Sequence, residues 1–275
     1  MLSRRLFLAG STLLPGAACA APQAELWPKW SAHQAGGSQR IDHGAWDRLL
    51  AARLAAGTDG INRFAYGAVT ANERQALDGY IAMLAAVPVS RLDQPEQRAY
   101  WINLYNALTV QVVLSRYPVK SIRDISISPG RFSSGPWGKK LVSVEGEPVS
   151  LDDVEHRILR PIWRDPRTHY AVNCASIGCP NLMPKAYTAA NMEELLNAGA
   201  RAYVNHPRGA RVDAGRLKVS SIYHWFQADF GGSPAGVIQH LRQFAEAPLA
   251  QALAGVATID GHDYDWALND AGNRV

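Results

Sequence analysis

The feature that most constrains the fold is a long apolar segment, EQRAYWINLYNALTVQVVLSRY, which runs from Glu96 to Tyr117 and is followed by Pro118. It predicts a helix of about six turns, because proline cannot continue a helix. The segment is apolar nearly all round, and a helix of that kind is buried on every side. We therefore expect a domain built around one central helix.

Shorter elements surround this segment. Helical patterns occur at residues 43–56, 72–86, 151–159, 188–204, 222–230 and 234–244. Hairpins are predicted at Glu145-Gly146 and Ala214-Gly215, and Thr168–Asn173 alternates like a strand. Short local strands among longer helices predict the α+β class, with the central helix packed on a small sheet of hairpin-connected strands.

We expect one globular domain over residues 41–275, preceded by an irregular arm at residues 21–40 that is rich in Trp, Pro, Gly and Gln. Residues 119–140 carry many Gly, Pro and Ser residues and predict an ordered loop. A loop of this length is uncommon without a role, so it is a candidate lid.

The first 20 residues have the layout of an export leader. Arg4-Arg5 precedes a short apolar run, Leu6–Leu14, and Ala18-Cys19-Ala20 fits a small-x-small cleavage site. The basic pair also resembles the twin-arginine signal. We expect cleavage near Ala20 and a periplasmic or secreted product, with a lipid anchor at Cys19 as the weaker alternative. No run in the remaining chain is long enough to predict a transmembrane segment.

The charge of the mature chain does not favour nucleic acid as a partner. Loss of Arg4 and Arg5 with the leader lowers the basic count from 28 to 26, against 24 acidic residues, so the net charge falls from +4 to +2. No basic stripe is present in the sequence. The partner we expect is an unidentified substrate or protein of the cell envelope, and the sequence indicates no cofactor.

Two of the three cysteines, Cys174 and Cys179, remain after the leader is removed. Cys174 follows the predicted strand and enters a turn with Ser176, an exposed position that suits a thiolate nucleophile. His156 is the candidate base. His169 lies five residues before Cys174, so in an extended strand the two side chains would point to opposite faces, about 16 Å apart.

Acidic residues near His156 could orient its imidazole. Asp152 and Asp153 precede it by four and three residues and share its helix face, whereas Glu155 is adjacent and points about 100° away. The alternative is that these acids lie in a first helical turn because the helix dipole favours negative charge there.

Two other uses of the cysteines compete with the nucleophile. A Cys174–Cys179 disulfide would close a small loop in a compartment that permits disulfides. A zinc site formed by both cysteines, His156 and His169 is less favoured, because C-x4-C is a loose spacing and no second knuckle follows.

Asn103 and Asn106 interrupt the apolar central helix on one face. They could position a substrate, an oxyanion or a catalytic imidazole, as Ser176 could. The alternative is structural: buried amides must be hydrogen-bonded, and an unpaired one costs about 1–3 kcal/mol.

Five segments, in this order, resemble the motifs of the family called domain of unknown function 547. They are Tyr100–Leu108, Leu151–Arg160, His169–Pro180, Ser220–Phe226 with Asp229-Phe230, and Tyr264–Asn269. The resemblance extends over residues 40–270, and Tyr170 stands where the family has Phe. The family has no established reaction, so the resemblance implies membership without an activity.

The chain has a looser likeness to papain- and transglutaminase-like hydrolases, which combine a central helix, a following sheet and a Cys–His pair. Here Asn103 and Asn106 occupy the helix where those enzymes place cysteine.

Two hypotheses for the function follow. The first is a thiol-dependent hydrolase or acyltransferase acting on peptide or amide bonds of the envelope. The second is a non-catalytic binding or scaffold domain whose His, Cys and Asn residues form a structural polar network.

Overall fold

The computed structural model describes residues 22–130 and 134–273, so the leader predicted at residues 1–20 lies outside the described residues. The α-helices are α1 Gly44–Arg53, α2 Ala71–Ala85, α3 Gln94–Arg116, α4 Arg160–Trp163, α5 Thr168–Ala171, α6 Met192–Val204, α7 Ser221–Trp225, α8 Pro234–Phe244 and α9 Ala247–Ala252. The strands are β1 Leu54–Ala56, β2 Asn62–Phe64, β3 Val142–Val144, β4 Glu147–Val149, β5 Ala210–Asp213, β6 Arg216–Ser220 and β7 Gly261–Asp263.

Several one-turn helices and one π-helix connect these elements. They are η1 Pro28–Ser31, η2 Tyr66–Ala68, η3 Val89–Arg91, η4 Ile122–Asp124, η5 Asp153–Leu159, η6 Gln227–Phe230 and η7 Ala271–Asn273, of which η5 is the π-helix. Within the described ranges, no helix is long and apolar enough to cross a membrane.

The predicted α+β class is confirmed. β1–β2 and β3–β4 are antiparallel two-stranded sheets, and β5–β6–β7 is a three-stranded sheet in which β7 pairs parallel to β6. The central helix, α3, is buried from Glu96 to Val110 and again at Val112–Leu114. Asp93 caps it, its side chain accepting the Glu96 N–H. Burial on all sides explains why this helix was the clearest signal in the sequence.

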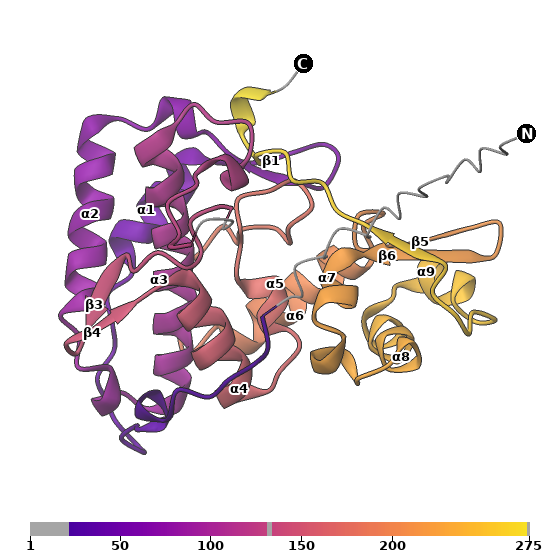
Figure 1. Cartoon of the computed structure of the whole chain (residues 1–275), viewed down its shortest axis with the longest axis horizontal. Coiled ribbons are helices and arrows are strands. Elements are labelled where there is room, and N and C mark those ends of the chain that lie inside the picture. The colour runs from indigo at the N-terminus through magenta and orange to yellow at the C-terminus, as the bar shows by residue number, and fades with distance from the viewer. Residues whose placement is uncertain (1–21, 131–133, 274–275) are drawn as a thin grey trace, which may run out of the picture.

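The molecule has two hydrophobic cores that meet at α5 and α6. The larger core surrounds α3 and collects α1, α2 and η5, whereas the smaller one lies among α6, β5, β6 and α8. In Figure 1 the helices α1, α2 and α3 lie on one side, and β5, β6, α8 and α9 lie on the other. Tyr170 belongs to the smaller core and its neighbour Ala171 to the larger one. Residues of α5 therefore join the two halves.

The C-terminal segment crosses back from the smaller half to the larger one. After β7 it runs towards β1 (Figure 1), where Asp270 pairs with Phe64. On the way, Leu268 pairs with Ser176. This return brings residues from the end of the chain beside the cysteine-bearing turn.

The strand predicted at Thr168–Asn173 is wrong. Thr168–Ala171 form the one-turn helix α5, and the backbone becomes extended only at Val172. All four residues of α5 are buried, because the two cores cover them from both sides. The alternation of residue types in this segment therefore does not mark one face towards the core and one towards solvent. Because the segment is not a strand, the argument that His169 and Cys174 lie on opposite faces of a strand does not apply.

Part of the 119–140 loop is held by its own hydrogen bonds. Gly135 N–H donates to the Arg123 carbonyl (3.2 Å), and the Gly138 N–H donates to Ser128 Oγ (2.9 Å). Ser128 Oγ in turn donates to the Gly135 carbonyl (2.9 Å). The loop is thus ordered over these residues, while its role as a lid stays a prediction.

Candidate functional site: a charge cluster and a thiol cluster

The first group of polar side chains begins on the π-helix η5. Ser150 and Asp153 cap the start of this helix, with the Ser150 N–H donating to Asp153 Oδ2 (2.8 Å) and the Asp153 N–H to Ser150 Oγ (3.2 Å). Pro161 has no N–H, so the His156 carbonyl five residues earlier lacks its π-helical donor. The arm supplies one instead, because the Glu25 N–H donates to His156 O (3.0 Å).

Five side chains then converge at the junction of the two cores, and we call them the charge cluster: Glu155, His156, Arg160, His169 and Asp229. His169 Nε2 lies 2.7 Å from Asp229 Oδ2, and its Nδ1 lies 3.6 Å from Glu155 Oε1. Arg160 Nε donates to the same Asp229 oxygen (2.6 Å). The Phe226 ring stacks on His169, at 4.5 Å between ring centres.

The charges of this cluster balance one another. Burial alone would raise the pKa of Glu155, but His156, His169 and Arg160 hold it at about 2. His169 and Arg160 similarly hold the pKa of Asp229 at about 2 against the effect of burial. Burial would lower the pKa of His169, but hydrogen bonds to Asp229 and Glu155 raise it. Two carboxylates therefore face one imidazolium and one guanidinium.

His156 differs because it stays neutral. Burial lowers the pKa of His156 to about 4, more than Glu155 raises it. Arg160 Nη1 lies 3.0 Å from His156 Nδ1, and since a guanidinium can only donate, Nδ1 must accept. The ring proton is then on Nε2, which lies 3.7 Å from Asp152 Oδ1. The lone pair that a general base needs is already engaged by Arg160.

The second group, which we call the thiol cluster, consists of Cys174, Ser176, Cys179 and Tyr264. The Cys174 sulfur lies 3.2 Å from Ser176 Oγ and 3.1 Å from the Tyr264 hydroxyl, and these two hydroxyls are 2.9 Å apart. The Cys174 N–H donates to Cys179 Sγ (3.0 Å). In the described part of the chain, neither His156 nor His169 is a hydrogen-bond partner of the Cys174 sulfur.

The turn that carries the thiol cluster is held by asparagines. Asn106 Oδ1 accepts the Asn173 N–H (2.8 Å), and Asn106 Nδ2 donates to the Ala171 carbonyl (2.9 Å). The Asn173 side chain accepts the Ala175 N–H (2.8 Å) and donates to the Pro180 carbonyl (2.7 Å). Ala175 has φ of 60°, a left-handed conformation that a non-glycine residue keeps only when its surroundings hold it there.

The return of the C-terminal segment fixes the other side of this turn. The Ile177 N–H donates to Ala267 O and the Gly178 N–H to Asp265 O, both at 2.8 Å. A Cβ on Gly178 would lie 2.8 Å from the Asp265 nitrogen, so only glycine permits this approach. The same approach brings Tyr264 onto the Cys174 sulfur.

The thiol cluster distinguishes its two sulfurs. The contact with Cys179, and then those with Ser176 and Tyr264, lower the pKa of Cys174 even though burial opposes this. Burial raises the pKa of Cys179 well above its ordinary value. Cys174 is also partly exposed, whereas Cys179 is buried. Thiolate character and access thus coincide at Cys174, as a nucleophile requires.

The central-helix asparagines are both saturated by backbone groups. Asn103 Nδ2 donates to the Tyr187 carbonyl (2.7 Å), and its Oδ1 accepts the Tyr187 N–H (3.0 Å). Asn106 makes the equivalent pair of bonds to the segment before Cys174. Neither amide faces a substrate space. Asn103 positions the chain before α6, and Asn106 positions the thiol turn.

The remaining candidates are placed as follows. Cys174 and Cys179 are both free thiols in the structure. The four side chains considered as zinc ligands are not gathered at one point, and over residues 22–130 and 134–273 no three His, Cys, Asp or Glu side chains form a metal-binding group. Ser176 joins the thiol cluster, and Glu155 and His169 join the charge cluster.

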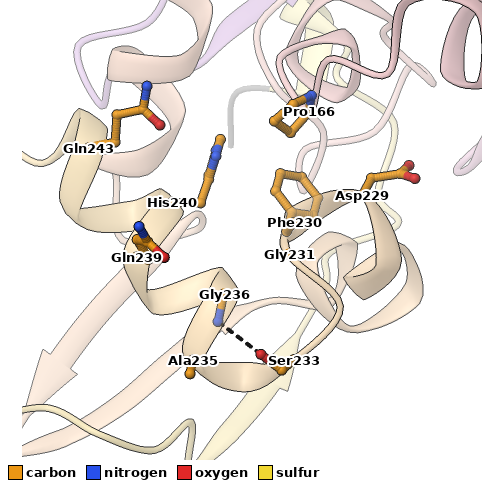
Figure 2. A pocket seen from close by; sticks show the side chains of 10 residues that line it. All are labelled: Pro166, Asp229, Phe230, Gly231, Ser233, Ala235, Gly236, Gln239, His240 and Gln243. Carbon is orange, nitrogen blue, oxygen red and sulfur yellow. Dashed lines mark hydrogen bonds between the residues drawn. The ribbon is translucent and has the colours of Figure 1, made fainter.

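A hollow of about 420 Å³ lies beside the charge cluster, between η6 and α8. Figure 2 shows Asp229 and Phe230 on one wall and His240 with Gln239 and Gln243 on the other. Asp229 is the one residue it shares with the charge cluster. The Cys174 turn does not line this hollow, so the hollow and the thiol are separate features.

These features define an α+β domain with a buried ionic cluster and a partly exposed thiol at the junction of two cores. The model of the family described as protein of unknown function, DUF547, matches residues 89–204. That segment, which holds α3, η5, α5 and the cysteine turn, is similar to this family, and the predicted resemblance is confirmed there. No curated protein and no solved structure matches the chain.

Sequence reasoning missed three members of the clusters, Arg160, Asp229 and Tyr264. It also missed two residues that hold the thiol turn: Asn173, and Asn269, whose Nδ2 donates to Asn173 Oδ1 (3.4 Å). All five lie inside the segments that resemble the family. Their contacts are long-range, with 90 residues separating Cys174 from Tyr264 and 69 separating Arg160 from Asp229. Helical and strand spacing relate only near neighbours, so the motifs themselves were the available signal.

Proposed function

We propose that the domain is a thiol-dependent acyltransferase or hydrolase acting on peptide or amide bonds of the cell envelope, with Cys174 as the nucleophile. The observation that carries the proposal is the pair of hydroxyls, on Ser176 and Tyr264, within 3.2 Å of the sulfur of a partly exposed cysteine. Hydroxyls that donate to sulfur stabilise the thiolate, which is the reactive form of cysteine.

The reaction has two balanced steps. The Cys174 thiolate attacks the acyl carbon, the carbon–nitrogen bond breaks, and the leaving amine takes a proton from solvent. An acceptor, either water or a second amine, then attacks the thioester, loses its proton and restores the thiolate. Ser176 and Tyr264 remain hydrogen-bonded to the sulfur when it leaves the thioester, which favours its departure as a thiolate.

His156 was the base of the sequence-based hypothesis, and the proposal does not depend on it. Its Nδ1 is 3.0 Å from Arg160 Nη1 and accepts the guanidinium proton. The two hydroxyls therefore take over the activation of Cys174. His156 and His169 keep the residues of η5 and η6 together.

Trp225 and Trp266 support a substrate-facing role for the thiol cluster. Their rings lie 4.9 Å and 4.7 Å from the Tyr264 ring, and both are partly exposed. Partly exposed aromatic rings beside a polar group are typical of ligand-binding surfaces. They would contact the apolar part of an acyl or peptide substrate.

The test is to trap the acyl intermediate. The full chain is incubated with p-nitrophenyl acetate, and the product is mapped by peptide mass. We expect one acetyl group on Cys174 and none on this peptide in Cys174→Ser, with circular dichroism showing that the variant folds. Acetylation that spares Cys174, or that is distributed over surface lysines alone, would overturn the proposal.

The saturated charge cluster favours a second candidate, a non-catalytic binding or scaffold domain of the envelope. Its charged groups already pair with one another, as expected of a network that fixes a fold. In that case Cys174→Ala and His156→Ala lower the melting temperature and leave ligand binding intact. Loss of acyl transfer at unchanged stability would count against this candidate.

A further inference from the structure

The two described thiols, those of Cys174 and Cys179, lie in contact within one tight turn. Cys179 Sγ is 3.0 Å from the amide nitrogen of Cys174, and the Cys179 N–H donates to the Ser176 carbonyl (3.1 Å). That amide nitrogen is two bonds from the carbon that carries the Cys174 sulfur. The Cys179 thiol is also a side-chain hydrogen-bond partner of the Cys174 thiol, so the two sulfurs lie side by side before any bond forms between them.

The surroundings of the two sulfurs differ in how readily a reagent from solvent can reach them. Cys174 is partly exposed and faces two hydroxyls, whereas Cys179 is 3% exposed and its sulfur lies 3.8 Å from the Val172 carbonyl. A disulfide from solvent can therefore reach Cys174 first. Cys179 is reached only from within the turn, which is the position of a resolving thiol.

We propose that Cys174 and Cys179 form a dithiol centre that exchanges with disulfides, with Cys174 attacking and Cys179 resolving. The Cys174 thiolate attacks one sulfur of the substrate disulfide, forming a mixed disulfide and releasing the other half as a thiolate. Cys179 gives its proton to solvent and attacks the Cys174 sulfur, which releases the second half. The protein loses two electrons, and the substrate disulfide gains them as two thiols.

The pKa directions agree with this assignment. The pKa of Cys174 lies below its ordinary value, which supplies thiolate for the first attack. Burial raises the pKa of Cys179, which keeps it protonated and unreactive until the mixed disulfide forms beside it. The exchange needs no imidazole, so the engagement of His156 by Arg160 does not prevent it.

The centre also has a regulatory consequence, which rests on the proposed acyl-transfer function. A Cys174–Cys179 disulfide removes the nucleophile, so acyl transfer would stop under oxidising conditions and return on reduction. The exchange reaction itself does not depend on any acyl substrate.

The experiment uses the full chain, and its probe is glutathione disulfide. The reduced protein is incubated with the probe, quenched with acid, alkylated and examined by intact and peptide mass. We expect Cys174 and Cys179 of the wild type both to lose their alkylatable thiols, with no glutathione on either peptide; the Cys19 peptide is followed separately. Cys179→Ser should retain one glutathione on Cys174, because no resolving thiol remains, and Cys174→Ser should acquire none on Cys179. Cys179→Ala is a second variant that introduces no buried hydroxyl.

Three outcomes would overturn the inference: glutathione retained on wild-type Cys174, a Cys179→Ser protein that acquires none, or attachment to Cys179 in Cys174→Ser. The acetyl-trapping experiment tests the acyl-transfer proposal separately from the dithiol centre. Disulfide formation without acetylation would refute only the acyl-transfer proposal, and acetylation of Cys174 without an internal disulfide would refute only the dithiol centre.

Discussion

The charge cluster and the thiol cluster both lie where the two cores meet, yet their partners differ in kind. In the charge cluster, His169 and Arg160 face Glu155 and Asp229, so positive and negative groups balance. In the thiol cluster, the partners that the described residues give the Cys174 sulfur are the hydroxyls of Ser176 and Tyr264 and the Cys179 thiol. A balanced ionic network holds segments in place, whereas a thiolate without a paired cation retains its reactivity. On the proposed function, the charge cluster stabilises the structure and the thiol cluster carries the chemistry.

The largest expected effect comes from unbalancing the charge cluster. Glu155→Gln removes one of two carboxylates and leaves a buried cation uncompensated, which should lower the free energy of unfolding by about 3–5 kcal/mol. Glu194→Gln, at an exposed position on α6, is the control and should change it by less than about 0.5 kcal/mol. Urea unfolding followed by circular dichroism measures both. Equal midpoints for the two variants would contradict the structural assignment.

Next is a matched pair of substitutions on α3. Asn103→Ala and Asn106→Ala each remove two hydrogen bonds to backbone groups. Each should lower the free energy of unfolding by roughly 2–4 kcal/mol, the penalty for two unsatisfied buried groups. Only Asn106 holds the segment before Cys174, so only Asn106→Ala should slow alkylation of Cys174 by iodoacetamide. Equal slowing in both variants would mean that Asn106 does not position the thiol.

Acidification should weaken the charge cluster. The pKa of His156 is about 4 in the folded chain, below the ordinary value of 6.5, so between these values the unfolded chain binds a proton that the folded chain does not. Stability should fall as pH decreases from 6.5 to 4, on the order of 2–3 kcal/mol for this group. Urea unfolding at pH 7 and pH 5 measures the fall.

Other groups modify this pH dependence in known directions. Burial, together with the charges of Glu155 and Asp153, raises the pKa of Asp152 to about 6. Protonation of Asp152 therefore increases stability as the pH falls from 6 to 4, which opposes the effect of His156. Glu155 and Asp229 lose their contribution only as pH falls towards 2. The fall should be smaller in His156→Gln, which cannot titrate but can still accept from Arg160. If the stability of His156→Gln falls with pH as much as that of the wild type, the other histidines cause the pH dependence.

The smallest expected effect on stability is that of Tyr264→Phe, because the position is partly exposed. Its chemical effect is larger. Loss of one hydroxyl partner should raise the pKa of Cys174, because one of the hydrogen bonds that lower it is removed, so alkylation of Cys174 by iodoacetamide should reach half its maximum at a higher pH. Tyr203→Phe is the control, since its hydroxyl donates to Gly178 O and Ser220 Oγ and does not contact the sulfur. An unchanged alkylation profile in Tyr264→Phe would remove Tyr264 from the thiol cluster.

The sequence predicted the features that depend on neighbouring residues. The central helix was expected at Glu96–Tyr117 and runs from Gln94 to Arg116. Both predicted hairpin turns are present, with positive φ at Glu145 and Ala214. Composition and local spacing are sufficient for such features, since each forms within a few turns of chain.

What the sequence did not predict depends on contacts between distant segments. α5 was expected as a strand because burial by both cores conceals its helical periodicity. The π-helical form of η5 depends on Pro161 and on the arm that supplies a donor to His156 O. The candidate residues lie in the motifs, but the strand argument that favoured His156 over His169 as the partner of Cys174 could not reveal Tyr264. The looser likeness to papain-like enzymes stays a prediction.

The most direct test of the central claim is the pH dependence of Cys174 alkylation in the intact, reduced protein. Iodoacetamide rates are measured from pH 5 to 10 by peptide mass, with a cysteine-containing peptide as the reference. We expect the Cys174 rate to reach half its maximum at a lower pH than the reference, and Cys179 to remain unlabelled in the same samples. A Cys174 midpoint at or above that of the reference, or faster labelling of Cys179, would contradict the assignment of a reactive thiol to Cys174.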